Sequence, residues 1–151
     1  MTANTPASRK AKGRRLQQAV RQDLIEHLGI DPGDILSTAM GQSGCDLYLS
    51  PAGRERFPFG VECKAQEAIA LPAWWKQCTA NAKKEELTPL LLIKRSREEP
   101  LAVLRWRDLL GLLDLITRGE IRGEPLNLAE ALAGDHRWQN LAEGLMGGER
   151  P

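Results

Sequence analysis

Residues 44–64 read GCDLYLSPAGRERFPFGVECK, and this run holds two segments in which apolar and polar side chains alternate. The first segment spans residues 45–50 and the second spans residues 59–64. Alternation with a period of two is typical of a β-strand that has one face on the core. The run therefore predicts two strands, separated by a turn around Gly53 within residues 51–58.

The polar faces of these two strands carry Asp46 on the first and Glu62 and Lys64 on the second. The apolar faces must lie on the same side to share a core, so the three polar side chains meet on the opposite side. A hairpin centred near Arg54 places Asp46 directly opposite Glu62, with Cβ atoms about 4.5–5.5 Å apart. Two carboxylates at that separation repel each other unless a cation neutralises them.

A divalent cation suits this pair, because Mg²⁺ favours one or two carboxylates together with waters and phosphate oxygens. Lys64 lies on the same face as Glu62, about 6.6 Å further along the strand. An ammonium there could stabilise a phosphate or orient an attacking water, which is the chemistry of phosphodiester hydrolysis. The alternative is a solvated sheet face, since a Glu-x-Lys triplet alone arises by chance in roughly every second chain of this length.

The remaining pattern predicts an α/β (α+β) domain. Helical periodicity favours helices over about residues 13–28, 71–84 and 108–118. Short strands are expected at residues 35–39, 89–93 and 101–106. The order of helix, three strands, helix, two strands and helix predicts a mixed central sheet flanked by helices.

A length of 151 residues suits one domain. We expect a disordered basic N-terminal arm over residues 1–11, the folded domain over residues 12–120 and a helical C-terminal extension over residues 121–151. Between residues 1 and 22 the six charged side chains are all Lys or Arg, which favours contact with a polyanion. A solvated tail is the alternative.

Composition excludes several function classes. The three cysteines, Cys45, Cys63 and Cys78, lack CxxC spacing, which favours reduced thiols in the cytoplasm over disulfides or zinc. The two histidines, His27 and His136, are far apart, so neither a zinc site nor a Ser/His/Asp triad is favoured. No apolar run is long enough for a membrane span, and the N-terminus lacks the apolar stretch of a signal peptide.

Four segments resemble the PD-(D/E)xK nuclease superfamily, in the order that the family has them. They are residues 12–17 (KGRRLQ), 43–46 (SGCD), 57–64 (FPFGVECK) and 75–82, from Trp75-Lys76-Gln77 to Asn81-Ala82. Within the superfamily the chain is most similar to phage and archaeal Holliday-junction-resolvase-like endonucleases, over roughly residues 10–106. The resemblance implies a restriction-endonuclease-like core.

The resemblance also implies roles for individual residues. Asp46 and Glu62 would bind Mg²⁺ or Mn²⁺, and the backbone carbonyl of Cys63 would add a ligand. Lys64 would be the catalytic lysine, and Gln77 would support the site or touch the scissile phosphate.

The first helix of the family often carries a Glu that completes the metal site, and Gln17 stands at this place. Its spacing to Val20 and Leu24 puts Gln17 at the inner edge of the helix, from which it can reach the site. A neutral amide is a weaker metal ligand than a carboxylate. DNA contacts are expected from Lys12, Arg14, Arg15, Ser43, Trp75 and Lys76, although Trp75 could instead pack in the core or in a dimer interface.

We therefore expect a Mg²⁺-dependent endodeoxyribonuclease that cuts branched DNA in recombination or repair. It would act as a homodimer in the cytoplasm of a bacterial or phage-infected cell. We expect no association with a membrane. Two alternatives remain open. The first is a DNA-binding accessory module with weak or no catalysis, and the second is a nuclease acting on ordinary duplex or single-stranded DNA.

Overall fold

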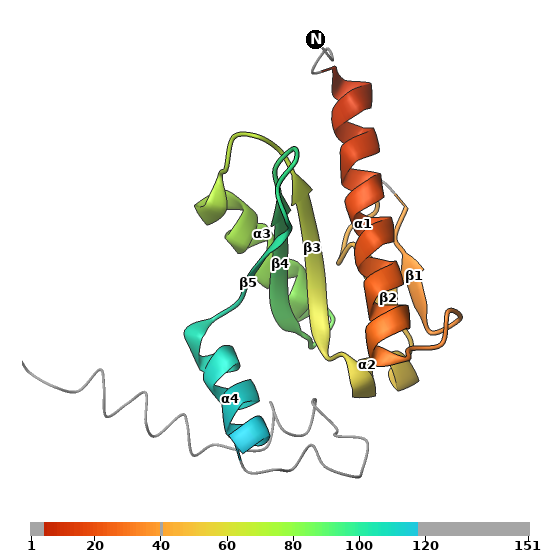
Figure 1. The fold of residues 1–151 in the computed structure, drawn as a ribbon, viewed down its shortest axis with the longest axis vertical. Helices are drawn as coiled ribbons and strands as arrows, with labels where there is room; N and C mark the ends of the chain where they lie inside the picture. Colours follow the sequence, from red (N-terminus) through yellow and green to blue (C-terminus); the bar gives the residue numbers. More distant parts are fainter. Residues whose placement is uncertain (1–4, 40, 118–151) are drawn as a thin grey trace, which may run out of the picture.

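The computed structural model describes residues 5–39 and 41–117, which form a mixed α/β arrangement (Figure 1). In chain order the elements are α1 (Pro6–Leu28), β1 (Ile35–Ser37), β2 (Leu47–Leu49), α2 (Pro51–Arg56), β3 (Phe59–Ala65), α3 (Leu71–Lys84), β4 (Thr88–Lys94), β5 (Leu101–Val103) and α4 (Trp106–Thr117). The predicted fold class is confirmed. The expected C-terminal extension, residues 121–151, lies outside the described residues.

The strands form two sheets where the sequence predicted one. The larger sheet has the order β3-β4-β5, with β3 parallel to β4 and β4 antiparallel to β5. The parallel pair requires a crossover, which α3 provides. The smaller sheet is the antiparallel pair β1-β2. It is separate because no ladder joins β2 to β3 within the described residues.

Helices cover both faces of the larger sheet. On one face, Leu16 and Val20 of α1 pack in a buried cluster with Val61 of β3. On the other face, Trp74 and Cys78 of α3 pack against Leu91 and Ile93 of β4. In Figure 1 the sheet accordingly stands between α1 and α3. Residues 59–63 of β3 are buried on both faces, so this strand lies at the centre of the fold.

Helix α1 begins at Pro6, seven residues before the predicted start. The side chain of Thr5 caps it by accepting a hydrogen bond from the backbone N–H of Ser8, and Pro6 occupies the first helical position, which suits its fixed φ. Residues 6–11, which we expected to be disordered, are therefore the first turns of a 23-residue helix.

Residues 51–56 form the short helix α2, so the predicted turn around Gly53 is wrong. Ser50 supplies the cap, because its hydroxyl accepts a hydrogen bond from the N–H of Gly53 at 3.1 Å, and Pro51 follows at the first helical position. A second difference is Trp106, which we expected at the end of a strand and which begins α4.

Gly60 allows α3 to approach β3 closely. A Cβ atom at this position would lie 2.8 Å from both the Cβ of Ala82 and the Sγ of Cys45. The α3 helix thus rests directly on the strand that carries Glu62. Among the helices of residues 5–39 and 41–117, none has the length and apolar character that crossing a bilayer requires.

Candidate active site

Asp46 lies beside β3 although no hairpin joins the two segments. Its backbone N–H donates to the carbonyl of Val61 at 2.8 Å, and its Oδ2 accepts from the backbone N–H of Cys63 at 2.6 Å. These two bonds bracket Glu62, so Asp46 stands opposite Glu62. They have the pattern of parallel strands, so the predicted antiparallel register is wrong. The side chain of Asp46 supplies the second bond, where a ladder would use a backbone carbonyl.

The loop before Asp46 is held by two contacts of Cys45. Gly44 has φ 120°, a conformation that disfavours any side chain. The N–H of Cys45 donates to Oε1 of Glu85 at 3.0 Å, and the carbonyl of Cys45 accepts from the Thr38 hydroxyl at 2.8 Å. The end of α3 and the strand β1 therefore fix the approach of the chain to Asp46.

Glu62 and Lys64 share a hydrogen-bonded network with α3. Glu62 is 3 % exposed, and its Oε1 lies 2.7 Å from Nζ of Lys64. Its Oε2 accepts from Nδ2 of Asn81 at 3.3 Å. Lys64 also donates to Oε1 of Gln77 at 2.9 Å. Both groups of the Glu-x-Lys triplet are thus oriented by one face of α3.

Gln17 completes the set from α1. It is 6 % exposed, and its side chain forms a hydrogen bond with Asp46. Gln17 therefore reaches the site, as its position on the inner edge of the helix predicted.

The electrostatics reflect two acids in a confined space. Burial raises the pKa of Asp46 to about 6. The hydrogen bond from Cys63 opposes this rise in pKa, whereas the nearby Glu62 carboxylate adds to it. The Lys64 ammonium and the hydrogen bond from Gln17 lower the pKa by smaller amounts. Burial also raises the pKa of the Cys63 thiol, and the Asp46 carboxylate adds to that rise. A thiol of this kind stays protonated at neutral pH and packs as a small apolar group.

These side chains surround a cleft of about 410 Å³. Its polar lining comes from Gln17, Ser43, Asp46, Glu62, Lys64, Gln77 and Asn81, and residues 41–44 also line it. Within the described residues, the structure thus brings together every residue that we expected at the catalytic centre.

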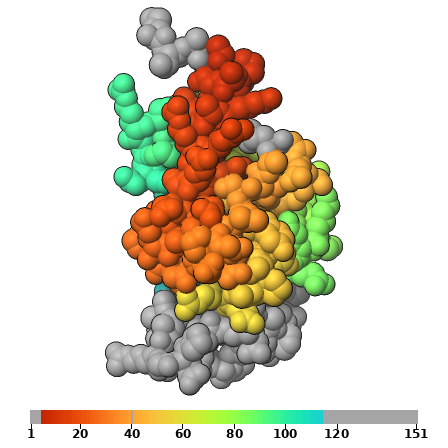
Figure 2. Space-filling model, turned by 90° about the vertical axis from the view of Figure 1, so that its right-hand side faces the viewer, coloured from red at the N-terminus to blue at the C-terminus, as the bar shows by residue number. Residues whose placement is uncertain are grey.

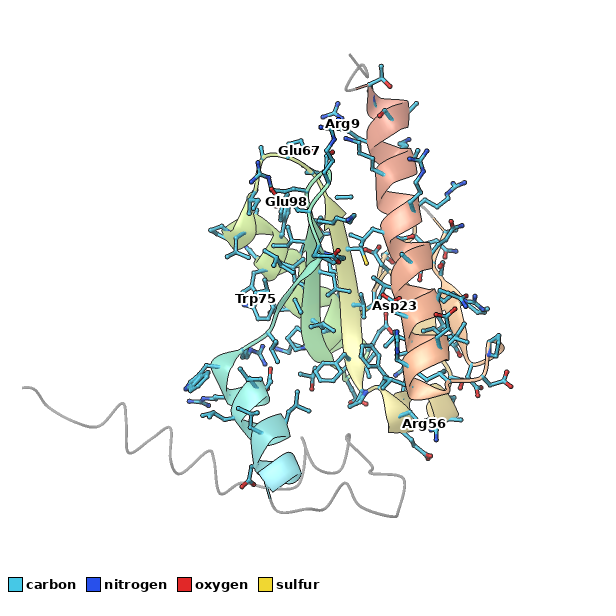
Figure 3. The ribbon with its side chains drawn as sticks, viewed as in Figure 1. Arg9, Asp23, Arg56, Glu67, Trp75 and Glu98 are labelled. Carbon is cyan, nitrogen blue, oxygen red and sulfur yellow. The ribbon has the colours of Figure 1, made fainter. Side chains whose placement is uncertain are left out.

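The expected DNA contacts divide into separate groups. Ser43 lines the cleft, whereas Lys12 and Arg15 line a second cleft and Lys76 a third. Arg14 is exposed on α1. Figure 3 shows Trp75 on the side of α3 away from α1, where it is partly buried against the core cluster of α3 and β4. Of the two alternatives for Trp75, this contact favours core packing.

Residues 8–115 match the model of the family described as "Phage putative PDDEXK endonuclease". This chain belongs to that family. Searches of the curated proteins and of the solved structures gave no match. The match spans the whole cleft, and it supports the predicted resemblance to phage PD-(D/E)xK nucleases.

The donor set of this cleft fits a hard divalent cation. Asp46 and Glu62 supply two carboxylates, and Mg²⁺ typically takes one or two with waters completing its shell. The ammonium of Lys64, 2.7 Å from Glu62, shows that the site accepts positive charge. No group of three or more His, Cys, Asp or Glu side chains suited to a metal occurs in residues 5–39 and 41–117. The residues therefore fit a hydrated ion better than a cage made by protein ligands alone.

Sequence reasoning gave no role to two residues of the endonuclease's site. Asn81 holds Glu62, and its position four residues after Gln77 puts both on one helix face, which was an available signal. Glu85 holds Cys45 across 40 residues of chain, and no local pattern indicates that contact.

Proposed function

We propose that this PDDEXK endonuclease is a metal-dependent deoxyribonuclease that hydrolyses phosphodiester bonds in branched DNA, in the manner of a Holliday junction resolvase. The observation that carries the proposal is the placement of Asp46 opposite Glu62, with the Lys64 ammonium 2.7 Å from Glu62, in one open cleft. Two acids and one lysine in this arrangement serve phosphate chemistry better than they serve stability, because like charges at close range repel.

Asp46, Glu62 and the backbone carbonyl of Cys63 would hold Mg²⁺ or Mn²⁺. When bound, such an ion polarises a phosphate oxygen and lowers the pKa of a coordinated water. Lys64 would stabilise the negative charge that develops on the phosphate, and Gln77 positions its ammonium through the 2.9 Å hydrogen bond.

The two neutral side chains of the site have positioning roles in this proposal. Gln17 donates to Asp46 and Asn81 donates to Glu62, so each acid keeps one oxygen oriented. Gln77 could also touch the scissile phosphate from the rim of the cleft.

DNA would lie across the cleft and be held by Lys12, Arg14, Arg15, Ser43 and Lys76, while Trp75 packs against the core. The preference for branched DNA rests on the resemblance to resolvase-like endonucleases. A resolvase makes two coordinated cuts, which implies two active sites and therefore a homodimer. We place the activity in recombination or repair, in the cytoplasm of a bacterial or phage-infected cell.

Gln17 favours a second candidate, a DNA-binding accessory module with weak or no catalysis. An amide stands in α1 where the family often has a third carboxylate, so Asp46 and Glu62 are left as the two acids of the cleft. In that case DNA would bind without being cut.

A substrate panel separates these functions. A labelled four-way junction, the matching duplex, a flap and a single strand are incubated with Mg²⁺, with Mn²⁺ or with EDTA. Paired cuts in the junction that require the metal are the expected result. Cutting of the duplex or the single strand instead would remove the branched-DNA assignment. Binding without cutting under either metal would favour the accessory module.

A further inference from the structure

A second cleft of about 410 Å³ lies at the carboxyl ends of β3 and β4. Its charged lining comes from α1, from the segment after β3, from the end of β4 and from the turn between β4 and β5, and consists of Lys12, Arg15, Glu67, Lys94, Arg95 and Arg97. Five of these side chains are cationic and one is anionic. This excess of positive charge contrasts with the whole chain, whose net charge is only +1.

The second cleft and the active site are both lined by the C-terminal end of β3. Lys64 lines the active site, and Ala65, the next residue of β3, lines the second cleft beside its strand partner Lys94.

Helix α1 stands between the two clefts. Gly13 and Gln17 line the active site, whereas Lys12 and Arg15 line the second cleft. Figure 2 shows the N-terminal half of α1 between the β4–β5 turn on one side and the segment after β1 on the other. The two clefts are therefore lined by neighbouring residues of the same helix.

Glu67 already acts as an anion inside this cleft. Its Oε1 accepts a hydrogen bond from the backbone N–H of Ser96 at 3.0 Å and another from the Ser96 hydroxyl. The same carboxylate lies 3.7 Å from Lys12 and 4.0 Å from Arg95. Figure 3 shows Glu67 and Glu98 at this end of the sheet. The Glu67 carboxylate is thus surrounded by a backbone N–H, a hydroxyl and two cations. These are the groups that bind a DNA phosphate in protein–DNA interfaces.

The remaining cations differ in how they are engaged. Arg95 pairs with Glu98 at 3.4 Å, and Lys94 donates to the carbonyl of Glu98. The side chains of Arg15 and Arg97 form no hydrogen bond or ion pair with any residue that the structure describes. Their guanidinium groups are thus available to an external anion without loss of an internal contact.

We propose that the second cleft binds a phosphate of the DNA backbone outside the active site, and that Glu67 is the internal anion which this phosphate displaces. The inference rests on the proposed function only because it takes DNA as the ligand, and it does not depend on catalysis. Arg15 and Arg97 provide the attraction, while Glu67 lowers the affinity and keeps the β4–β5 turn in place until DNA arrives.

Binding of a labelled DNA duplex is measured in EDTA, so that no cutting occurs, across a range of salt concentrations. The double variant Arg15→Gln/Arg97→Asn should bind about thirtyfold more weakly at 0.15 M salt, and the salt slope should fall by about 0.9 for each lost phosphate contact. Asn suits position 97 because Arg97 has φ 63°, a conformation that Asn tolerates. Glu67→Gln should bind about fivefold more tightly, because it removes one repelling charge and keeps an acceptor for Ser96.

The matched control is Arg107→Gln, an exposed arginine of α4 at the opposite end of the sheet. It removes a positive charge and should leave binding unchanged. Unaltered circular dichroism establishes that each variant is folded. The proposal would be overturned if Arg107→Gln lost as much DNA affinity as the double variant loses for each charge removed. Weaker DNA binding by Glu67→Gln would overturn it as well. If the unaltered protein binds no DNA in EDTA, both this proposal and the proposed function fail; if it binds and the double variant binds equally well, this proposal alone fails.

Discussion

The backbone N–H of Cys63 donates to the Asp46 carboxylate at 2.6 Å, so the strand that carries Glu62 and Lys64 orients an acid 17 residues earlier in the chain. This bond has a cost. It places the Asp46 carboxylate next to Glu62 in a partly dehydrated cleft, and burial raises the pKa of Asp46 to about 6. The pair is therefore poised to gain from any cation that enters.

Metal affinity should weaken below about pH 6. A carboxyl group must lose its proton to bind a metal, and Asp46 holds its proton below this pH. We expect the apparent dissociation constant for Mn²⁺ to rise about tenfold between pH 7 and pH 5, as followed by isothermal titration calorimetry. An affinity that stays constant over this range would show that Asp46 is not a ligand.

The variant Asp46→Asn should be more stable than the unaltered protein in EDTA at pH 7. Because the pKa of Asp46 is raised in the folded state, the stability it contributes below about pH 4 is lost as the pH rises through about 6. Removing the charge restores on the order of 2 kcal/mol, or roughly 5 °C in melting temperature. Thermal unfolding in EDTA and in Mg²⁺ measures both effects, and added Mg²⁺ should stabilise only the unaltered protein.

The local patterns of the sequence predicted this site better than they predicted the sheet around it. Alternation over residues 45–50 and 59–64 put Asp46, Glu62 and Lys64 on one face, and that depends only on the two-residue period of a strand. The pairing of β2 with β3 was wrong, because Ser50 and Pro51 start a helix where a turn was expected. The cap and the proline were visible in the sequence, yet six residues with little apolar periodicity give a weak helix signal.

The other features that the sequence did not predict depend on contacts between segments far apart in the chain. The α1 helix could not be extended back to Pro6 from its polar composition, since its first turns bury little apolar surface. The bond from Cys45 to Glu85 spans 40 residues and follows from the packing of α3 on β3. Such pairs arise from tertiary structure, for which a single sequence holds no periodic signal.

The close approach at Gly60 predicts a sharp steric effect. Gly60→Ala places a methyl group 2.8 Å from Ala82 and from the Sγ of Cys45, so α3 must move away from β3. We expect a loss of about 1–3 kcal/mol in unfolding free energy, measured by urea denaturation.

Gly13→Ala is the matched control for this effect. Nothing lies within 4 Å of a Cβ atom at Gly13, and the residue is inside α1, so alanine should stabilise the protein by about 0.5–1 kcal/mol. The same sign of change in both variants would contradict the packing described for Gly60.

Arg54 and Glu85 should behave as one unit. Arg54 lies 3.3 Å from Oε2 of Glu85 and donates to the carbonyls of Glu85 and Leu49, while Glu85 holds Cys45 beside Asp46. In a double-mutant cycle with alanine at both positions we expect a coupling of about 0.5–1 kcal/mol, since the pair is partly exposed. Both single variants should also weaken Mn²⁺ binding. Additive effects on stability together with unchanged Mn²⁺ affinity would exclude a positioning role.

The most direct test of the account is the rate of DNA cleavage in Mg²⁺ by Glu62→Gln and Lys64→Met, compared with Glu55→Gln. Glu55 is an exposed acid of α2, outside the cleft, and serves as the matched control. If Glu62 holds the metal and Lys64 stabilises the phosphate, each active-site variant loses roughly 10²- to 10³-fold in rate while the control retains full activity. Cleavage that persists in Glu62→Gln and Lys64→Met at the rate of the control would contradict the assignment of this cleft as the active site.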